Sequence, residues 1–146
     1  MADFASELIG KVFAASAPVR VTAEMIADFC AAVGETNPLH LDAEFARRGP
    51  YGVIVAPLSV SGSFRAAEDI FDHLPPSERR LLASMELEFL APIRAEDTIT
   101  ISSAVTEIYE KTGRSGVMVF TVIRSTLTNQ DGAIVTRLDH RFTSRK

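Results

Sequence analysis

Apolar residues recur at helical spacing early in the chain. After a weak strand predicted over Leu8 to Ala14, a helix is expected to begin at Thr22 and to end at Gly34. Its apolar side carries Met25, Ile26, Phe29, Cys30 and Val33. A shorter helix over Ala43 to Arg47 is expected to take Asp42 as its N-terminal cap.

The longest helix is predicted over Leu58 to Leu74. Pro57 suits the first helical position, where its missing N–H costs nothing, and the two prolines at 75 and 76 end the helix. Small residues alternate with bulky ones along this segment, a mixture that lets the backbone of a sheet approach closely. We therefore expect a helix packed against a sheet.

The apolar period changes from helical to alternating after this segment. Strands are predicted over Leu81 to Leu90, Thr98 to Tyr109, Gly116 to Leu127 and Ala133 to Thr143, and turn residues at 129–132 join the last two into a hairpin. The stretch Val117 to Ile123 is apolar on both faces, which is typical of a central strand or of one that meets another subunit. Helices followed by antiparallel strands predict one α+β domain over residues 1–146.

Composition narrows the function classes. The 146 residues are 47% hydrophobic and carry a net charge of −4 without a long basic run, so a nucleic-acid partner is not expected. No apolar run approaches the ~20 residues that span a bilayer, and the N-terminus lacks signal-peptide features, which predicts a cytoplasmic protein with no membrane partner. The single cysteine, Cys30, is expected to be a buried structural thiol. No Cys/His cluster or Gly-rich phosphate loop predicts a metal or nucleotide site.

The candidate chemistry lies in the segment from Gly34 to Asp42, which we call the elbow. It holds Glu35 and His40 on either side of Asn37 and a proline that breaks the preceding helix. A carboxylate and an imidazole at this spacing can polarise a water molecule, because histidine exchanges protons near neutral pH. The same residues also serve structural purposes elsewhere: a carboxylate caps backbone amides, asparagine stabilises turns and a loop histidine is often only hydrogen-bonded.

The segment from Phe29 to Asp42 resembles the signature of the MaoC-like, or R-specific enoyl-CoA hydratase, family, which has an acid, an Asn-Pro, a histidine and a further Asp. Ile54 to Pro57 is similar to the entrance of that family's central helix, and Met85 to Arg94 with Asp97-Thr98 to the strand and turn after it. The resemblance implies a hot-dog fold, in which an antiparallel sheet wraps around one long central helix.

The resemblance also implies roles for individual residues. Glu35 and His40 become the catalytic acid and base that hold a water and add it to a trans-2-enoyl thioester, and Asn37 fixes the loop. Backbone near Pro57 and Leu58 holds the thioester carbonyl, and Ser61 or Ser63 supports the acid. Coenzyme A or phosphopantetheine enters as part of the substrate, and no other cofactor is implied.

The chain departs from the family pattern at three places. Glu35 stands where the family has Asp, and its extra methylene displaces the carboxylate by more than the ~0.5 Å to which productive geometry is held. Ala56-Pro57 replaces the usual His-Gly, and because proline has no N–H, the amide of Leu58 would have to serve. The supporting serine has no fixed register, and Arg65 falls near its position.

The leading hypothesis is therefore hydration of enoyl thioesters or dehydration of 3-hydroxyacyl thioesters. The alternatives are a non-catalytic acyl-thioester-binding subunit of a heteromeric dehydratase and a hot-dog thioesterase. The resemblance implies a homodimer or higher homo-oligomer, and a heterodimer with a related subunit is the alternative.

Overall fold

One antiparallel sheet of five strands forms the body of the protein, in a computed structural model that describes residues 5, 7–67, 69–74, 76–77, 79–114 and 116–145. The strands are β1 (Val19–Arg20), β2 (Arg80–Phe89), β3 (Thr98–Gly113), β4 (Gly116–Thr128) and β5 (Ile134–Arg145). Their order is β1-β3-β4-β5-β2. The four strands predicted after residue 80 are thus confirmed, and β4, which is apolar on both faces, is the central strand.

The hairpin between β4 and β5 is also confirmed. The side-chain oxygen of Asn129 accepts hydrogen bonds from the backbone N–H groups of Asp131 and Ala133, each at 3.0 Å. Gly132 has a φ of 77°, which a residue without a Cβ adopts at little cost. These residues fix the register in which β4 pairs with β5.

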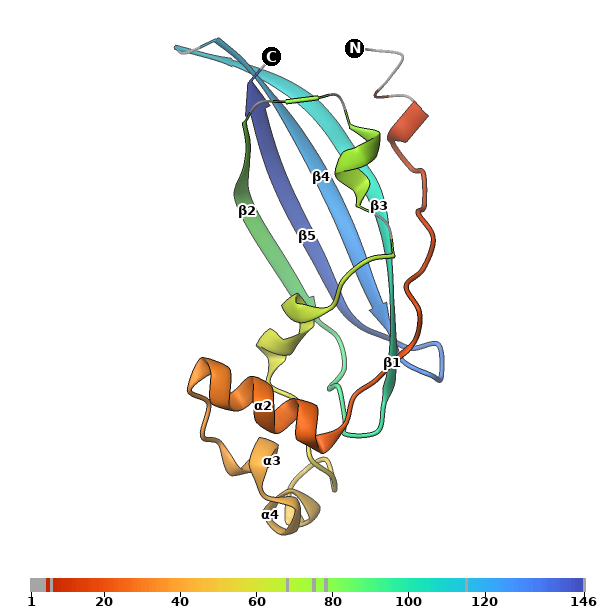
Figure 1. The fold of residues 1–146 in the computed structure, drawn as a ribbon, viewed down its shortest axis with the longest axis vertical. Helices are drawn as coiled ribbons and strands as arrows, with labels where there is room; N and C mark the ends of the chain where they lie inside the picture. The colour runs from red at the N-terminus through yellow and green to blue at the C-terminus, as the bar shows by residue number, and fades with distance from the viewer. Residues whose placement is uncertain are drawn as a thin grey trace.

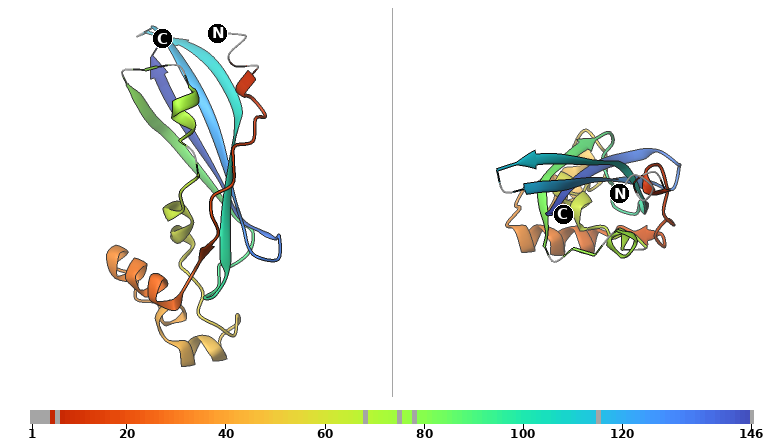
Figure 2. Two further views of the ribbon diagram at one scale, coloured as in Figure 1. Left: turned by 45° about the vertical axis from the view of Figure 1, so that its right-hand side comes forward. Right: turned by 90° about the horizontal axis from the view of Figure 1, so that it is seen from above.

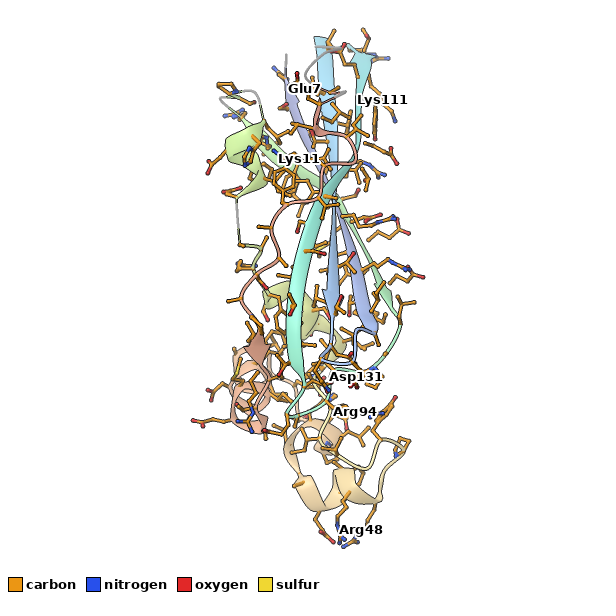
Figure 3. All side chains as sticks on the ribbon, turned by 90° about the vertical axis from the view of Figure 1, so that its right-hand side faces the viewer. Glu7, Lys11, Arg48, Arg94, Lys111 and Asp131 are labelled. Atoms are coloured by element: carbon orange, nitrogen blue, oxygen red, sulfur yellow. The ribbon has the colours of Figure 1, made fainter. Side chains whose placement is uncertain are left out.

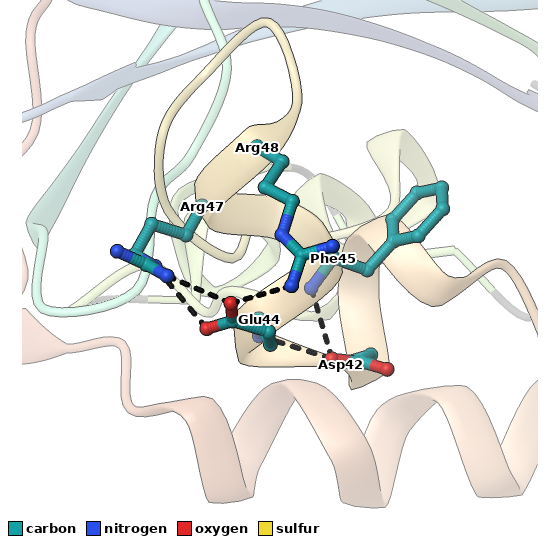
Figure 4. A network of polar contacts seen from close by, with 5 residues as sticks. All are labelled: Asp42, Glu44, Phe45, Arg47 and Arg48. Carbon is teal, nitrogen blue, oxygen red and sulfur yellow. Dashed lines mark hydrogen bonds and ion pairs between the residues drawn. The ribbon is translucent and has the colours of Figure 1, made fainter.

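The two helices predicted in the first part of the chain form, and a third short helix forms between them. Helix α2 (Ala23–Val33) is capped by the Thr22 side chain and ends at Gly34, whose φ is 74°. Helix α3 (Pro38–Leu41) follows, and then α4 (Ala43–Arg48). Asp42 caps α4 by accepting from two backbone N–H groups at 3.0 Å each, and Arg47 and Arg48 of that helix both pair with Glu44 (Figure 4).

The long helix expected over Leu58 to Leu74 does not form, so that prediction is wrong. Two short 3-10 helices, η1 (Leu58–Ser63) and η2 (Ile70–His73), replace it, and the backbone is extended at Phe64. Serines and a glycine are weak helix formers, and their side chains compete for backbone groups. The Ser63 hydroxyl donates to the carbonyl of Val60, and the Arg65 guanidinium donates to the carbonyl of Gly62.

Two smaller expectations also need correction. Leu8 to Ala14 is not a regular strand; it follows the outer edge of β3 through isolated bridges of Ile9 to Val105 and of Val12 to Ala104. Pro57 is the cap of η1 and not its first residue. Both differences are local and leave the sheet unchanged.

The sheet has one covered and one open face. Figures 1 and 2 show α2, α3 and α4 gathered at one end of the sheet, with the segment that carries η1 and η2 running along one face. The molecule is long, and Figure 3 places Glu7 and Lys111 near one end and Arg48 at the other. The buried residues form two clusters, one that includes Ile26 of α2 and Val60 of η1, and one that includes Ile70 of η2 and Val105 of β3.

Candidate functional site

The elbow holds the Glu35 side chain against its own backbone. One carboxylate oxygen, Oε1, accepts hydrogen bonds from the backbone N–H groups of Thr36 and Asn37, both at 2.8 Å. The N–H group of Asn37, followed by that of Thr36, lowers the pKa of Glu35, because both donors favour the ionised form. Glu35 therefore stays a carboxylate, and no donor from the described part of the chain is bonded to its second oxygen, Oε2.

His40 is tied to the segment that leads into η1. Its Nδ1 atom lies 2.6 Å from the backbone carbonyl oxygen of Val55. A carbonyl only accepts, so Nδ1 carries the proton of the neutral ring and Nε2 is left with its lone pair. The amide of Val55 in turn donates to the carbonyl of Leu39 at 3.4 Å. Val55 thus fixes both the position and the tautomer of the imidazole.

Asn37 has a capping role in the structure. Its side-chain oxygen accepts from the N–H of Leu39 at 3.0 Å at the start of α3. This bond orients the turn between Glu35 and His40.

The entrance to η1 is held by the segment before β3. The amide of Ala56 donates to the carbonyl of Ile93, and the amide of Ala95 donates to the carbonyl of Ile54, both at 2.8 Å. The first hydrogen bond of η1 runs from the Val60 amide to the Pro57 carbonyl, so the N–H groups of Leu58 and Ser59 precede it. Pro57 is buried, and the Leu58 side chain is 56% exposed.

The two candidate serines are used inside the fold. Ser61 is 2% exposed, and its hydroxyl lies 2.9 Å from that of Thr136 on β5. The Ser63 hydroxyl donates to the Val60 carbonyl at 2.7 Å. The structure therefore links Ser61 to the sheet and Ser63 to its own helix, while Glu35, Asn37 and His40 share the elbow.

A second group of polar residues lies outside the elbow. A cavity of about 340 Å³ is lined by Arg65, Ala66, Asp69, Ile70, Phe71, Ser103, Ile123, Ser125, His140 and Phe142. Burial lowers the pKa of His140; the nearby Asp139 carboxylate opposes this shift, and Arg65 adds a smaller contribution in the direction of burial. His140 is not among the site residues that the sequence predicts, although it shares the face of β5 that holds Leu138 and Phe142. The alternation of side chains between the two faces of β5 is the sequence signal that could have placed His140 on the covered face.

Within the described ranges, no three His, Cys, Asp or Glu side chains are grouped as metal ligands. No helix in that part of the chain is long and apolar enough to cross a membrane.

Comparison with known proteins supports the fold. A family described as "FAS1-like, dehydratase domain region" matches residues 7–138. A UPF0336 protein from Streptomyces coelicolor is 30% identical over 111 residues, which cover 73% of this chain and 74% of that protein. A MaoC-like dehydratase from Rhodospirillum rubrum is similar with a TM-score of 0.72 and 24% identity, over 94% of this chain and 92% of that chain.

A heteromeric protein has a similar fold. The structure of a 3R-hydroxyacyl-ACP dehydratase complex, HadBC, from Mycobacterium tuberculosis gives a TM-score of 0.76 at 21% identity, over 94% of this chain and 97% of that chain. These similarities confirm the predicted α+β hot-dog fold and the resemblance to MaoC-like proteins.

Proposed function

The chain belongs to the family of FAS1-like dehydratase domain regions, and we propose that it hydrates trans-2-enoyl thioesters or, in reverse, dehydrates 3-hydroxyacyl thioesters. The observation that carries this proposal is the hydrogen bond from His40 Nδ1 to the Val55 carbonyl, because it leaves Nε2 as a base in the same elbow as an ionised carboxylate. The substrate would be a thioester of coenzyme A or of an acyl carrier protein.

In the hydration direction, His40 Nε2 removes a proton from a water molecule that Glu35 Oε2 orients. The water oxygen forms a bond to C3 of the enoyl group, and the electron pair of the C2–C3 double bond moves toward the thioester carbonyl. The imidazolium then returns its proton to C2, which restores the neutral ring. Glu35 accepts a hydrogen bond from the water molecule and orients it, and it does not donate a proton, because its lowered pKa makes it a poor proton donor.

The negative charge that develops on the thioester carbonyl needs a hydrogen-bond donor. We assign this role to the N–H of Leu58, which precedes the first hydrogen bond of η1. Pro57 contributes the shape of the entrance and no donor. Because η1 has only six residues, the donor itself matters more here than a helix dipole.

The purified protein with crotonyl-CoA tests the proposal. Loss of the absorbance of the conjugated thioester without release of free thiol is the expected result. Release of thiol without loss of the double bond would instead favour a thioesterase. His73→Gln, on η2 outside the elbow, is the matched histidine control and is expected to keep the wild-type rate.

One observation favours a second candidate, a non-catalytic acyl-binding subunit. The longer Glu35 side chain turns one carboxylate oxygen back onto the amides of Thr36 and Asn37, so a capping role explains that oxygen fully. This candidate predicts that the purified protein is inactive alone and that activity appears only when a related hot-dog subunit is added.

We propose a second copy of this chain as the partner, bound at the edge of the sheet formed by β2. Within the described chain β2 pairs only with β5, which leaves its other edge with unpaired backbone groups. Leu82, Met85 and Phe89 project from the same face of β2 as their paired residues on β5, and each is at least 41% exposed. A second strand at this edge would cover both the backbone and these side chains.

A further inference from the structure

The cavity that contains His140 lies where the predicted long helix is interrupted. Residues of the link between η1 and η2, among them Arg65 and Ala66, form one wall, and β3, β4 and β5 form the other. In Figure 1 this link runs along the sheet away from α2, and η2 lies toward the opposite end of the sheet. A continuous helix over 58–74 would have placed different side chains over the sheet. The cavity beside His140 therefore depends on the extended backbone that follows η1.

The cavity is not a purely apolar pocket. Ile70, Phe71, Ile123 and Phe142 supply apolar walls, but Ser103 and Ser125 place two hydroxyls there that lie 2.8 Å apart. His140 stacks near Phe142, with 6.1 Å between ring centroids. No side chain or backbone group in the described part of the chain is hydrogen-bonded to the His140 ring. Its nitrogens are therefore available to a ligand.

A ligand that fills this space keeps solvent from the nitrogens of the imidazole. A hydrocarbon chain offers no hydrogen bond in return and would leave the ring nitrogens unpaired, which is unfavourable. A hydroxyl or keto oxygen restores the lost bond, because a neutral imidazole has both a donor and an acceptor nitrogen.

We propose that this cavity binds the distal part of the acyl group of the thioester substrate and selects one that carries a hydroxyl or keto oxygen, with His140 as its hydrogen-bond partner. The inference rests on the proposed function and adds the substrate class. It also gives His140 a role in specificity and none in the chemistry of water addition.

The charges at the rim favour an uncharged oxygen over a carboxylate. Arg65 and Asp69 line the cavity with opposite charges, so no net charge selects an ion. Arg65 donates to the Gly62 carbonyl at 3.3 Å, and Asp69 accepts from the Phe71 amide at 2.9 Å, so both are also engaged with the backbone.

The position of the cavity fits an acyl chain that starts at the elbow. Thr136 of β5 contacts Ser61 of η1, next to the proposed donor Leu58. His140 lies four residues further along the same strand and on the same face, which is roughly 13 Å at the usual rise per strand residue. The hydroxyl or keto oxygen that binds His140 would therefore lie on a part of the acyl chain well away from the thioester.

Calorimetric binding of saturated acyl-CoA thioesters, which cannot be hydrated, tests this inference. The probes are dodecanoyl-CoA and a series of hydroxydodecanoyl-CoA isomers with the hydroxyl moved from the middle to the end of the chain. At one position the wild type is expected to bind the hydroxylated chain about tenfold more tightly than dodecanoyl-CoA, as one hydrogen bond allows. His140→Phe should abolish this preference, and His140→Gln, which keeps a donor and an acceptor, should retain most of it.

Equal affinity for all isomers in the wild type, or a preference that persists in His140→Phe, would overturn the inference while leaving turnover of enoyl thioesters unaffected. If no acyl-CoA binds at all, the proposed function fails together with it. His73→Gln serves as the control and should keep the wild-type preference.

Discussion

The Nδ1 atom of His40 lies 2.6 Å from the carbonyl oxygen of Val55 and joins the elbow to the segment that leads into η1. The link has two consequences. It ties the imidazole to the segment that leads to the proposed donor at Leu58, and it decides which nitrogen is basic. A catalytic histidine needs both, since rate depends on geometry as well as on proton affinity.

The charge of Glu35 can be separated from its capping role. Glu35→Gln keeps an oxygen for the amides of Thr36 and Asn37 but removes the charge, whereas Glu35→Ala removes both. We expect both variants to lose hydration rate and Glu35→Ala to lower the melting temperature more than Glu35→Gln does. Steady-state assays beside thermal unfolding check this, and a wild-type rate in Glu35→Gln would contradict the role of the carboxylate.

Acidic pH should reduce the stability that the ionised Glu35 side chain gives to the elbow. The pKa of Glu35 is lowered in the folded state from its ordinary value of 4.5, chiefly by the Asn37 amide. A carboxylate with a lowered pKa contributes stability above its unfolded pKa and loses it as pH falls through the folded value. The difference in unfolding free energy between wild type and Glu35→Gln should therefore be constant above pH 4.5 and shrink below it. A difference that is unchanged in acid would show that the amide bonds do not stabilise the charge.

His140 should also make the protein less stable in acid, but in a higher pH range than Glu35 does. Burial lowers its pKa from 6.5, so the unfolded chain binds a proton before the folded chain does. Stability is therefore fully retained above pH 6.5 and falls as the solution is acidified below it. Chemical denaturation at several pH values should show a smaller loss in His140→Phe than in wild type. Parallel curves for the two proteins would contradict the burial of the ring.

The contact between Ser61 and Thr136 is expected to stabilise the fold. Both residues are at most 2% exposed, so removal of one hydroxyl leaves the other without its partner. Ser61→Ala should cost about 1–3 kcal/mol of unfolding free energy. The double variant with Thr136→Val should cost less than the sum of the single changes, because no buried hydroxyl remains unpaired. Strictly additive effects would mean that the two hydroxyls do not interact.

Association through β2 can be blocked without disturbing the core. Met85 is 50% exposed on the edge strand, and Met85→Lys places a charge where a second strand would pack. Sedimentation analysis should show a dimer for wild type and a monomer for this variant. Val12→Lys, a similar change beside β3 at the other side of the sheet, should remain dimeric. A dimer that survives Met85→Lys would exclude this edge as the interface.

The sheet and the elbow were predictable because their signals are local. Alternation over 81–143 marks the strands, and Thr22 and Asp42 have the side chains that start the two predicted helices. The short helix α3 after Asn37 was not predicted. The long helix was predicted wrongly because Pro57 and the apolar residues of 58–74 suggest one, while Ser63 and Arg65 bind backbone carbonyls instead. The Val55 carbonyl carries no side-chain signal at all, so no sequence pattern could identify it as the partner of His40.

The most direct test of the central claim is the hydration rate of crotonyl-CoA by His40→Asn beside the wild type. Asparagine has an N–H to donate to the Val55 carbonyl but has no counterpart of Nε2, so the tether is preserved and the base is lost. We predict a rate at least about a hundredfold lower, the usual contribution of a general base, with an unchanged melting temperature. A variant that hydrates crotonyl-CoA at the wild-type rate would contradict the assignment of His40 as the base.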